Sequence, residues 1–463
     1  MYQTIVSLAV SAKCGRIYLN GKWLLKSGFE PADPYEIEIK ENRIVLRKSE
    51  TGSRRVSAKS NQTIPVIDIQ NAGLLDVFKS TVKLQVRAQE HVITITPAHI
   101  AQRIAERQQA AKSMTEGSLF SGGGLMTEAA AGLGFTPRLA VEIDSRYTEI
   151  YAQNHPSADI FNSSVEEVSF DSLRSYAPLG LLTMGIPCEP FSQARSLDCG
   201  TKTKRDKSVA PEAHENGDMV FWALRAIEAT NPFTVVIEES PNFLKAGASH
   251  ILMHAMRRMG YHVDARVISP VDYDELQIRK RAIIIGRTDG PVQWPVPVPA
   301  ATRRIADILD PASEVEGEWF TRATKGWLYD HWDRQRAKGN GFSSFAVTAD
   351  SPSVAGIKKR YLNQVGDNPV LAHPTEEGKF RFFTLSEIRR LAALPDGYKL
   401  DEHSKTVSGE VIGQGVVVST IREIVAVNCG LRAGVDTAPA VSEKMVVIEP
   451  HGQLDLFSLV EAA

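Results

Sequence analysis

The sequence is poor in cysteine and lacks long apolar runs. Its four cysteines (Cys14, Cys188, Cys199 and Cys429) form no CxxC pair, which indicates neither a zinc site nor a disulfide framework. No apolar run is long enough to span a bilayer, and no signal-peptide pattern is present. We therefore expect a cytoplasmic protein with no membrane partner and no metal.

An excess of charge of one sign is also missing. The 463-residue chain has a formal net charge of −2, so any binding of nucleic acid has to use a local basic surface. A chain of this length has room for two or three domains, each with its own core.

The N-terminal region contains a duplicated β-rich pattern. Residues 17–25 are echoed by residues 67–75, and each copy is followed by two segments of alternating apolar and polar side chains. These segments are 35–39 with 43–46, and 82–86 with 91–95. Such alternation predicts half-buried strands joined by hairpins. One repeat is too short to bury a core alone, so we expect the two repeats to pair.

Two segments of the first repeat resemble the SymE-like branch of the AbrB swapped-hairpin family. They are Tyr18-Leu19-Asn20-Gly21-Lys22-Trp23-Leu24 and Gly28-Phe29-Glu30-Pro31. The resemblance implies an all-β, swapped-hairpin-like domain in which two copies form an internal pseudo-dimer. DNA binding and a packing or dimerisation role both remain open for this domain. Residues 98–114 then have the composition of a connecting helix.

A glycine-rich turn opens the central part of the chain. Phe120-Ser121-Gly122-Gly123-Gly124 precedes an Ala-rich helix, and the next predicted strand ends at Glu142-Ile143. A glycine turn lets a nucleotide-like ligand approach the backbone, and an acid about twenty residues later suits ribose hydroxyls. No phosphate-binding lysine follows the turn, which favours S-adenosylmethionine as the ligand.

Cys188 lies in a loop directly after an apolar run. Residues 179–184 have the pattern of a buried strand, and Gly185, Pro187 and Pro190 mark the loop that leaves it. Enzymes with α/β folds place reactive groups at such strand ends. A buried cysteine without a chemical role shows the same local pattern, so the neighbouring motifs decide between the two interpretations.

Carboxylates and hydrogen-bond donors follow two later strands. Glu238 and Glu239 end a predicted strand, and repulsion between them predicts a raised pKa for one of the two. Gln277, Arg279 and Arg281 are expected to share one face of a strand, a row suited to phosphate and base carbonyl oxygens.

The ordered set resembles the cytosine-5 DNA methyltransferase family. The matching segments are the turn 120–124, Glu142, Pro187-Cys188, Glu238, Gln277-x-Arg279-x-Arg281, Arg381-x-x-Thr384-x-x-Glu387 and Gly413-Gln414-Gly415-Val416. The resemblance implies an α/β, class I S-adenosylmethionine-dependent methyltransferase, with a Rossmann-like mixed sheet and an inserted target-recognition domain. The implied substrate is a cytosine flipped out of double-stranded DNA.

The resemblance also implies roles for single residues. Cys188 is the nucleophile that adds to C6, Glu238 contacts N3 and the exocyclic amine, and Arg281 with Arg279 holds O2 and the flanking phosphate. Ser192 and Gln277 are expected to bind substrate. The expected cofactor contacts are Phe120, Ser121, Gly122, Gly123, Gly124, Glu142, Ile143, Ser164, Pro187, Gly413 and Val416.

Several positions depart from the family pattern. Glu189 stands where Gln is usual, Glu239-Ser240 where Asn-Val is usual, and Gln414-Gly415 where Asn precedes Ser or Ala. Ser163-Ser164-Val165 replaces Gly-Asp-Ile. An RNA (tRNA) cytosine-5 methyltransferase and a DNA-binding regulator with an inactive core remain alternatives. The long segment between Gly286 and Phe380 favours DNA. The presence of Cys188, Glu238 and Arg281 together favours an active enzyme.

The segment between Gly286 and Phe380 interrupts the α/β pattern. A Pro-rich linker at 291–299 precedes basic residues interleaved with aromatic ones. Most of the basic residues are expected to contact phosphates, and few to read base edges. They are Arg322, Lys325, Arg334, Arg336, Lys338, Lys358, Lys359 and Arg360, and the aromatic residues are Trp327, Tyr329, Trp332 and Tyr361.

The tail contains Gln453-Leu454-Asp455-Leu456-Phe457, which resembles the peptide with which bacterial proteins bind the replication sliding clamp. A short terminal segment with apolar anchors suits docking on a partner. The alternative is a final strand or helix packed on its own domain. The predicted domains are 1–97 (duplicated β domain), 98–115 (linker helix), 116–290 (cofactor-binding catalytic domain), 291–378 (target recognition), 379–432 (return to the catalytic domain) and 433–463 (tail).

Overall fold

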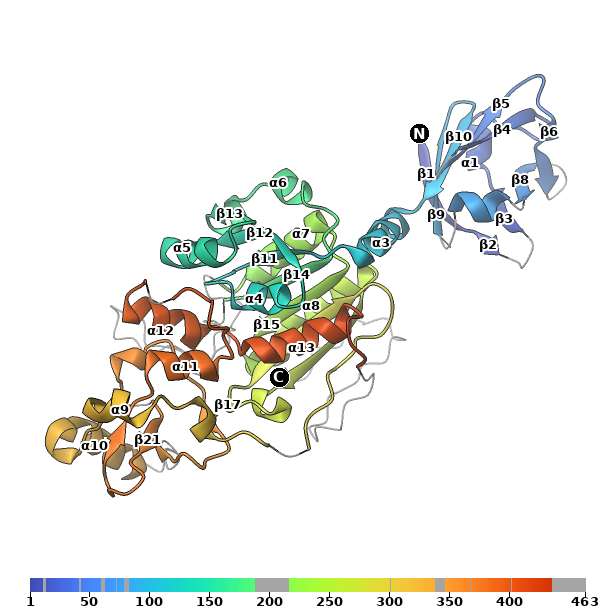
Figure 1. Ribbon diagram of the computed structural model, residues 1–463. Helices are drawn as coiled ribbons and strands as arrows, with labels where there is room; N and C mark the ends of the chain where they lie inside the picture. The colour runs from blue at the N-terminus through green and yellow to red at the C-terminus, as the bar shows by residue number, and fades with distance from the viewer. Residues whose placement is uncertain are drawn as a thin grey trace, which may run out of the picture.

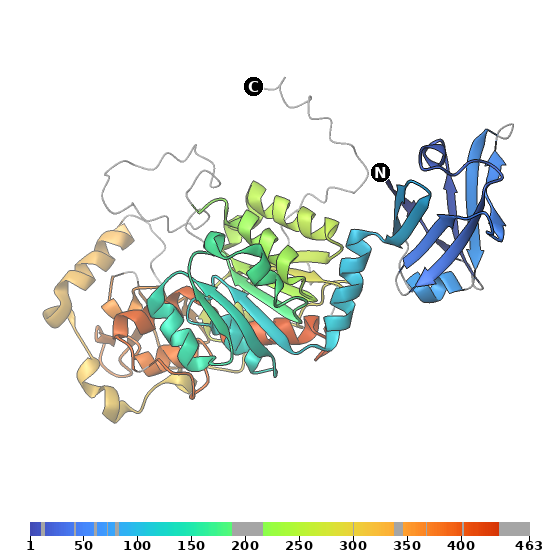
Figure 2. The ribbon, with the colours of Figure 1, turned by 90° about the horizontal axis from the view of Figure 1, so that it is seen from above.

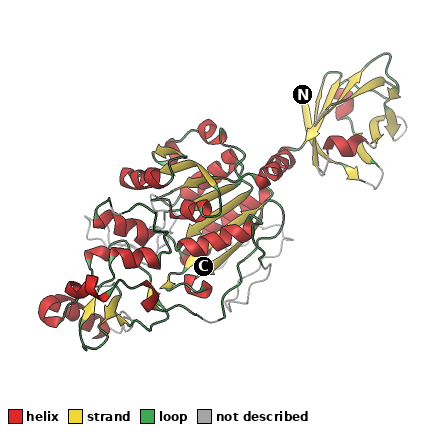
Figure 3. Cartoon of the chain, viewed as in Figure 1, coloured by secondary structure: helices red, strands yellow, loops and turns green. Residues whose placement is uncertain are grey.

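The computed structural model describes residues 1–10, 14–40, 43–59, 63–71, 73–78, 83–187, 216–299, 301–337, 346–366, 368–400 and 402–434. Figure 1 shows a β-rich N-terminal domain, one connecting helix, a central α/β domain and a region of short helices and strands. Figure 3 shows the same view coloured by secondary structure. None of the helices in these ranges has the length and apolar content needed to cross a membrane.

The N-terminal domain contains two sheets. Their strand orders are β1-β9-β10-β5-β4-β6 and β2-β3-β8-β7. The strands are β1 (Tyr2–Ser7), β2 (Ala9–Val10), β3 (Gly15–Asn20), β4 (Pro34–Lys40), β5 (Arg43–Lys48), β6 (Arg54–Arg55), β7 (Ser57–Lys59), β8 (Ile64–Asn71), β9 (Lys83–Gln89) and β10 (Val92–Pro97). The domain is not purely β, because a short helix follows β3 and another follows β8: α1 (Trp23–Lys26) and α2 (Gly73–Phe78).

The two sequence repeats pair with each other, which confirms that expectation. Ile17 is equivalent to Ile67 in the two repeats, and Leu19 is equivalent to Ile69. In β3 and β8 Ile17 pairs with Ile69 and Leu19 with Ile67, so the pairing of the repeats is reciprocal. The second strands of the two hairpins, β5 and β10, pair in the same reciprocal way, Ile44 with Ile95 and Leu46 with Ile93. All eight side chains lie in one buried cluster. The apolar face of each repeat is therefore covered by the other repeat.

Helix α3 (His99–Gln109) packs against the central domain (Figure 2). The Arg107 side chain is 1% exposed. Its guanidinium lies over the Tyr261 ring, 3.9 Å from the ring centroid, and donates to the Met259 carbonyl. Asn231 Nδ2 donates to the Arg103 carbonyl at 3.1 Å. The predicted linker helix is therefore part of the surface of the central domain.

The central domain is built on a seven-stranded sheet in the order β13-β12-β11-β14-β15-β18-β16. Its strands are β11 (Thr115–Leu119), β12 (Thr136–Glu142), β13 (Asp159–Asn162), β14 (Leu181–Gly185), β15 (Thr234–Glu239), β16 (His262–Ile268) and β18 (Arg281–Arg287). The first four pairings in this order are parallel, and β18 is antiparallel to both of its neighbours. This is the predicted mixed sheet.

Helices cover both faces of this sheet (Figure 1). The helices α4 (Leu125–Ala131), α5 (Ser145–Asn154) and α13 (Val418–Asn428) contribute to one buried cluster. The helices α6 (Phe170–Arg174), α7 (Met219–Thr230) and α8 (Gly247–Arg258) contribute to another. Because α13 returns from the far end of the chain to pack on α4, the segment after the recognition region completes the domain, as predicted.

Two segments of short elements share a core with the central domain: residues 291–378, where target recognition is expected (the recognition region), and residues 379–432 (the closing segment). The recognition region contains α9 (Ala312–Val315), α10 (Arg322–Ala337), β19 (Ala346–Val347), β20 (Val354–Ala355) and β21 (Val370–Ala372). The closing segment contains β22 (Phe380–Arg381), α11 (Leu385–Leu391) and α12 (Lys405–Gln414) before α13. One continuous hydrophobic cluster reaches from Leu125 to Tyr361 and Phe383. The sheet β19-β21-β22 continues across position 379, where the sequence suggested a boundary.

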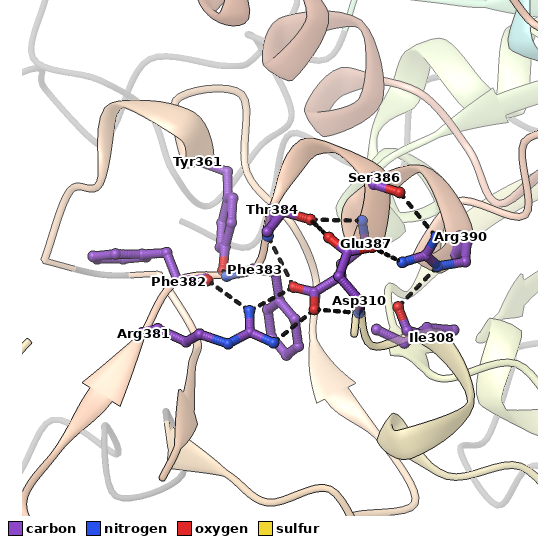
Figure 4. A network of polar contacts seen from close by, with 10 residues as sticks. All are labelled: Ile308, Asp310, Tyr361, Arg381, Phe382, Phe383, Thr384, Ser386, Glu387 and Arg390. Carbon is purple, nitrogen blue, oxygen red and sulfur yellow. Dashed lines mark hydrogen bonds and ion pairs between the residues drawn. The ribbon is translucent and has the colours of Figure 1, made fainter. Parts of the chain in front are cut away.

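A buried ion pair in the closing segment contacts the recognition region (Figure 4). Arg381 and Glu387 are 2% and 0% exposed and form two hydrogen bonds of 2.7 Å. Glu387 Oε2 also accepts from the Thr384 amide, and Glu387 Oε1 from the Asp310 amide, both at 2.9 Å. Because the carboxylate has four donors, the buried charges are compensated. The segment 381–387, predicted as a family motif, therefore joins the closing segment to the recognition region at Asp310.

Candidate active site

The glycine turn connects β11 to α4 at the end of the parallel strands. Gly122 and Gly124 have φ values of +53° and +91°. A Cβ atom added to Gly124 would lie 2.8 Å from the Tyr151 ring and 2.9 Å from the His155 ring. Both the backbone conformation and the close approach therefore require glycine at position 124.

Glu142 joins this turn to the end of β12. Its Oε2 accepts from the Gly122 amide at 2.8 Å, and its Oε1 accepts from the Asp144 amide at 2.9 Å. Burial raises the pKa of Glu142. The adjacent Ile143 is 69% exposed, which is unusual for an isoleucine. Carboxylate oxygens for ribose hydroxyls and an exposed apolar side chain for adenine are the groups that an adenosyl ligand requires.

Ser164 and the described end of the Cys188 loop lie at the same edge of the sheet. Ser164 follows β13, which pairs with β12 up to the residue Glu142. Gly185, the last residue of β14, pairs in register with Glu238 of β15. Ile186 and the half-buried Pro187 follow directly. The predicted nucleophile Cys188 and the predicted substrate residue Ser192 lie outside the described residues.

Glu238 and Arg281 form an ion pair at the ends of adjacent strands. Glu238 is 9% exposed, and its Oε1 forms an ion pair with the guanidinium Nε of Arg281, the first residue of β18. A Cβ atom on Gly185 would lie 3.8 Å from Glu238 Oε2 and 3.5 Å from the Phe120 carbonyl. The structure thus brings the glycine turn, the end of β14, Glu238 and Arg281 together.

Of the two adjacent carboxylates, Glu239 is the one whose pKa is strongly raised. Burial raises the pKa of Glu239 to about 8, so this group is expected to hold its proton at neutral pH. The Ser240 amide donates to Oε2, while Oε1 is buried and has no hydrogen-bond partner within the described part of the chain. The sequence predicts one raised pKa in this pair, and the family resemblance assigns the contacts with the cytosine N3 and exocyclic amine to Glu238.

Gln277 and Arg279 lie in a different environment from Arg281. The expected single strand is interrupted: β17 (Gln277–Ile278) pairs with β20, and β18 begins only at Arg281. Gln277 Nε2 donates to the Leu391 carbonyl at 3.2 Å. Arg279 Nη1 donates to the Ile357 carbonyl at 2.8 Å, and its Nη2 to the Gly413 carbonyl at 2.9 Å. Both side chains are buried, and both donate hydrogen bonds to backbone carbonyls of the recognition region or the closing segment.

The closing segment lies close to the recognition region and to α5. A Cβ atom on Gly413 would lie 2.4 Å from the Lys358 carbonyl carbon, so glycine is required for this contact. Val416, two residues after the end of α12, is buried. The next residue after Gly413, Gln414, donates to the Tyr147 hydroxyl at 2.7 Å. The sequence does not predict this contact of Tyr147, which lies on α5, because its own segment shows no motif.

Several of the basic residues expected to contact phosphate have partners within the protein. Arg322 pairs with Asp330 at 3.0 Å and with Asp333. Lys325 donates to Gln364 and lies 4.7 Å from the centroid of the Phe320 ring. Tyr361 is fully buried, whereas Trp327 is 56% exposed. Arg334 and the run 358–360 are exposed, and Lys338 lies outside the described residues.

The mixed sheet and the glycine turn followed by an acid at the end of the next strand are those of an α/β methyltransferase fold. A model of the C-5 cytosine-specific DNA methylase family matches residues 114–428. The chain belongs to this family. It is accordingly a DNA cytosine-5 methyltransferase, and the family implies S-adenosylmethionine as the methyl donor.

Relatives agree with this assignment. The chain is 22% identical over 303 residues to the Type II methyltransferase M1.HphI of Haemophilus parahaemolyticus, covering 62% of this chain and 79% of the relative. It is 25% identical over 320 residues to M.DsaV of Dactylococcopsis salina, covering 66% and 83%. The crystal structure of the S. pombe Dnmt2 methyltransferase shares the fold, with a TM-score of 0.54, 18% identity and coverage of 68% of this chain and 98% of that one.

Proposed function

We propose that Cys188 is the nucleophile of this methyltransferase and that the target is a cytosine flipped out of double-stranded DNA. The observation that supports this most is the Glu238–Arg281 ion pair beside Gly185, three residues before Cys188 in the sequence. A cytosine ring needs a thiolate, an acid and a cation together. Glu238 and Arg281 supply the last two at this edge of the sheet, and Cys188 follows Gly185 closely in the sequence.

The reaction follows from the chemistry of the ring. The Cys188 thiolate adds to C6, forming a C–S bond and making C5 nucleophilic. When bound, S-adenosylmethionine supplies an electrophilic methyl group to C5. Loss of the C5 proton to a base, with expulsion of the Cys188 thiolate, restores the aromatic ring. The positive charge of Arg281 favours the thiolate form of a neighbouring cysteine.

Glu238 and Arg281 exchange partners when the base enters. Glu238 contacts N3 and the exocyclic amine of cytosine, and Arg281 contacts O2. Their mutual ion pair keeps both side chains at the site before the base arrives. Arg279 and Gln277, whose donors bind protein carbonyls, support this site rather than contact the base.

The cofactor site consists of the glycine turn and the strand ends around it. To this site we assign Phe120 to Gly124, Glu142, Ile143, Ser164 and Pro187, and from the closing segment Gly413 and Val416. Glu142 binds the ribose hydroxyls while it holds the Gly122 amide. The exposed Ile143 packs on the adenine.

DNA modified by incorporation of 5-fluorocytosine tests the covalent step. Fluorine at C5 cannot leave as a proton does, so the adduct accumulates after methyl transfer. A complex that survives denaturing electrophoresis is expected for wild type with S-adenosylmethionine, and none for Cys188→Ala. The same complex with Cys188→Ala would show that another residue is the nucleophile.

The two terminal segments carry separate proposals. The reciprocal pairing of the N-terminal repeats is what a SymE/AbrB-like pseudo-dimer requires.

The tail is proposed to dock on the bacterial sliding clamp. This proposal rests on sequence alone, because the peptide lies outside the described residues: Gln453, Leu454, Asp455, Leu456 and Phe457. Full-length protein is expected to bind purified clamp, and Leu456→Ala with Phe457→Ala to abolish binding. Ser458→Ala is the control, and equal binding by all three proteins would refute the proposal.

Methylation within a restriction-modification system, as in the Type II relatives, is the biological setting we propose.

A further inference from the structure

Two buried side chains from distant segments hold the carbonyls of the glycine turn. The Tyr398 hydroxyl donates to the Gly123 carbonyl across a sequence separation of 275 residues. His155 Nε2, near the end of α5, lies 3.3 Å from the Gly124 carbonyl. Tyr398 and His155 are 2% and 3% exposed. With Glu142 on the Gly122 amide, three consecutive residues of the turn are each held by a different side chain.

Tyr398 is itself fixed on both sides. Its carbonyl accepts from Arg389 Nη2 of α11 at 2.7 Å. The next residue, Lys399, donates its amide to Asn154 Oδ1 of α5 at 2.7 Å, and its carbonyl accepts from Asn154 Nδ2 at 3.1 Å. Burial raises the pKa of the Tyr398 hydroxyl, which therefore keeps its proton and acts as a donor. The hydroxyl is placed by the protein before any ligand arrives.

The turn needs such support because of its backbone. Phe120 has a positive φ value of 52°, a conformation that is costly for a residue with a side chain and that persists where surrounding contacts hold it. A Cβ atom on Gly123 would lie 2.7 Å from Val411 of α12 and 3.2 Å from the Tyr398 hydroxyl, so the turn lies directly against these side chains. Val411 and Tyr398 thus cover the side of the turn at Gly123. At Gly122 no atom lies within 4 Å of where a Cβ atom would be, so this side of the turn is open.

We propose that Tyr398 is a positioning residue for the cofactor turn, which it holds in the conformation that binds the methyl donor, with His155 as a second support. This inference rests on the proposed cofactor site. It assigns to the segment after α11 a role in binding the cofactor, in addition to its place in the fold.

The test compares two tyrosine hydroxyls in the full-length protein. Tyr398→Phe removes the donor to Gly123 and keeps the ring. Tyr361→Phe is the matched control, since its hydroxyl is also buried, donates to the Pro369 carbonyl at 2.8 Å and accepts from the Phe383 amide at 2.9 Å, but lies in the recognition region. Calorimetry without DNA measures the Kd for S-adenosylmethionine and for S-adenosylhomocysteine, and thermal unfolding measures stability.

The Kd of Tyr398→Phe for both ligands is expected to rise roughly 5- to 100-fold, the effect of one lost buried hydrogen bond. Tyr361→Phe is expected to lower the unfolding temperature without changing either Kd. Wild-type affinity in Tyr398→Phe, or equal weakening in both variants, would overturn the inference while leaving the proposed function intact. Failure of the wild-type protein to bind either ligand would instead contradict the proposed cofactor site, and with it this inference.

Discussion

At the scale of single residues, the site combines groups that the sequence indicates with groups that only packing defines. Glu142 and Glu238 lie at the ends of strands and Arg281 at the start of one, in a recognisable order, and the structure brings Glu238 and Arg281 into contact. The adjacent carboxylates predict one raised pKa, but burial, which the local pattern does not show, makes Glu239 the residue with that pKa. Tyr398 escapes notice for the same reason, because its acceptor is 275 residues away.

The raised pKa of Glu239 predicts how stability changes with pH. Its pKa is raised from 4.5 to about 8, so the stabilising effect of the bound proton is complete below pH 4.5 and is lost as pH rises through 8. Glu239→Gln keeps the shape and cannot ionise. Relative to this variant, wild type is expected to lose up to about 1.4 kcal/mol of unfolding free energy per pH unit across that window.

Urea unfolding at several pH values between 5 and 9 measures this difference. Glu314→Gln, which changes an exposed glutamate of α9, is the control and should run parallel to wild type. A constant difference between wild type and Glu239→Gln over the whole range would show that Glu239 is ionised in the folded protein.

At the scale of elements, alternation and apolar runs predict most strands of the central sheet and of the N-terminal repeats. The break between β17 and β18 could not be predicted. It arises because Gln277–Ile278 pairs with Val354–Ala355, and the sequence of one strand does not reveal a partner so distant in the chain. The short helices α1 and α2 were also missed, because one or two turns leave little periodicity to detect.

The buried guanidinium of Arg279 predicts a large cost for a conservative substitution. Arg279→Lys cannot reach both the Ile357 and the Gly413 carbonyls and leaves buried acceptors unsatisfied. We expect a loss of about 2 kcal/mol in unfolding free energy. Arg304→Lys is the matched control: this arginine also donates to two carbonyls, of Ala301 and Arg303, but is exposed.

Chemical denaturation followed by tryptophan fluorescence measures both variants. The control is expected to change stability by less than about 0.5 kcal/mol. If the two substitutions had the same small effect, the carbonyl contacts of Arg279 would not be what joins the recognition and closing segments.

At the scale of the whole molecule, the N-terminal domain has its own core and the remainder is one continuous unit. The buried cluster of the N-terminal domain contains only residues from Leu8 to Ile95. Among the described residues, the other two clusters contain only ones after position 113. Helix α3 lies between them in sequence, but its arginines bind the central domain.

This division predicts where the chain can be shortened. Deletion of residues 1–97 is expected to leave the Kd for S-adenosylmethionine and the unfolding temperature of the remainder unchanged, because α3 still covers Tyr261. Deletion of residues 1–112 uncovers that face and is expected to lower the unfolding temperature. Calorimetry of both truncated proteins tests this, and identical unfolding temperatures would show that α3 contributes nothing to the central domain.

The central claim is that this chain methylates cytosine in DNA through Cys188. The most direct measurement is transfer of labelled methyl from S-adenosylmethionine to unmethylated duplex DNA, with digestion to nucleosides to locate the label. The account predicts 5-methylcytosine for wild type and for Cys199→Ala, and none for Cys188→Ala. Label in Cys188→Ala DNA, or its loss only with Cys199→Ala, would contradict the account.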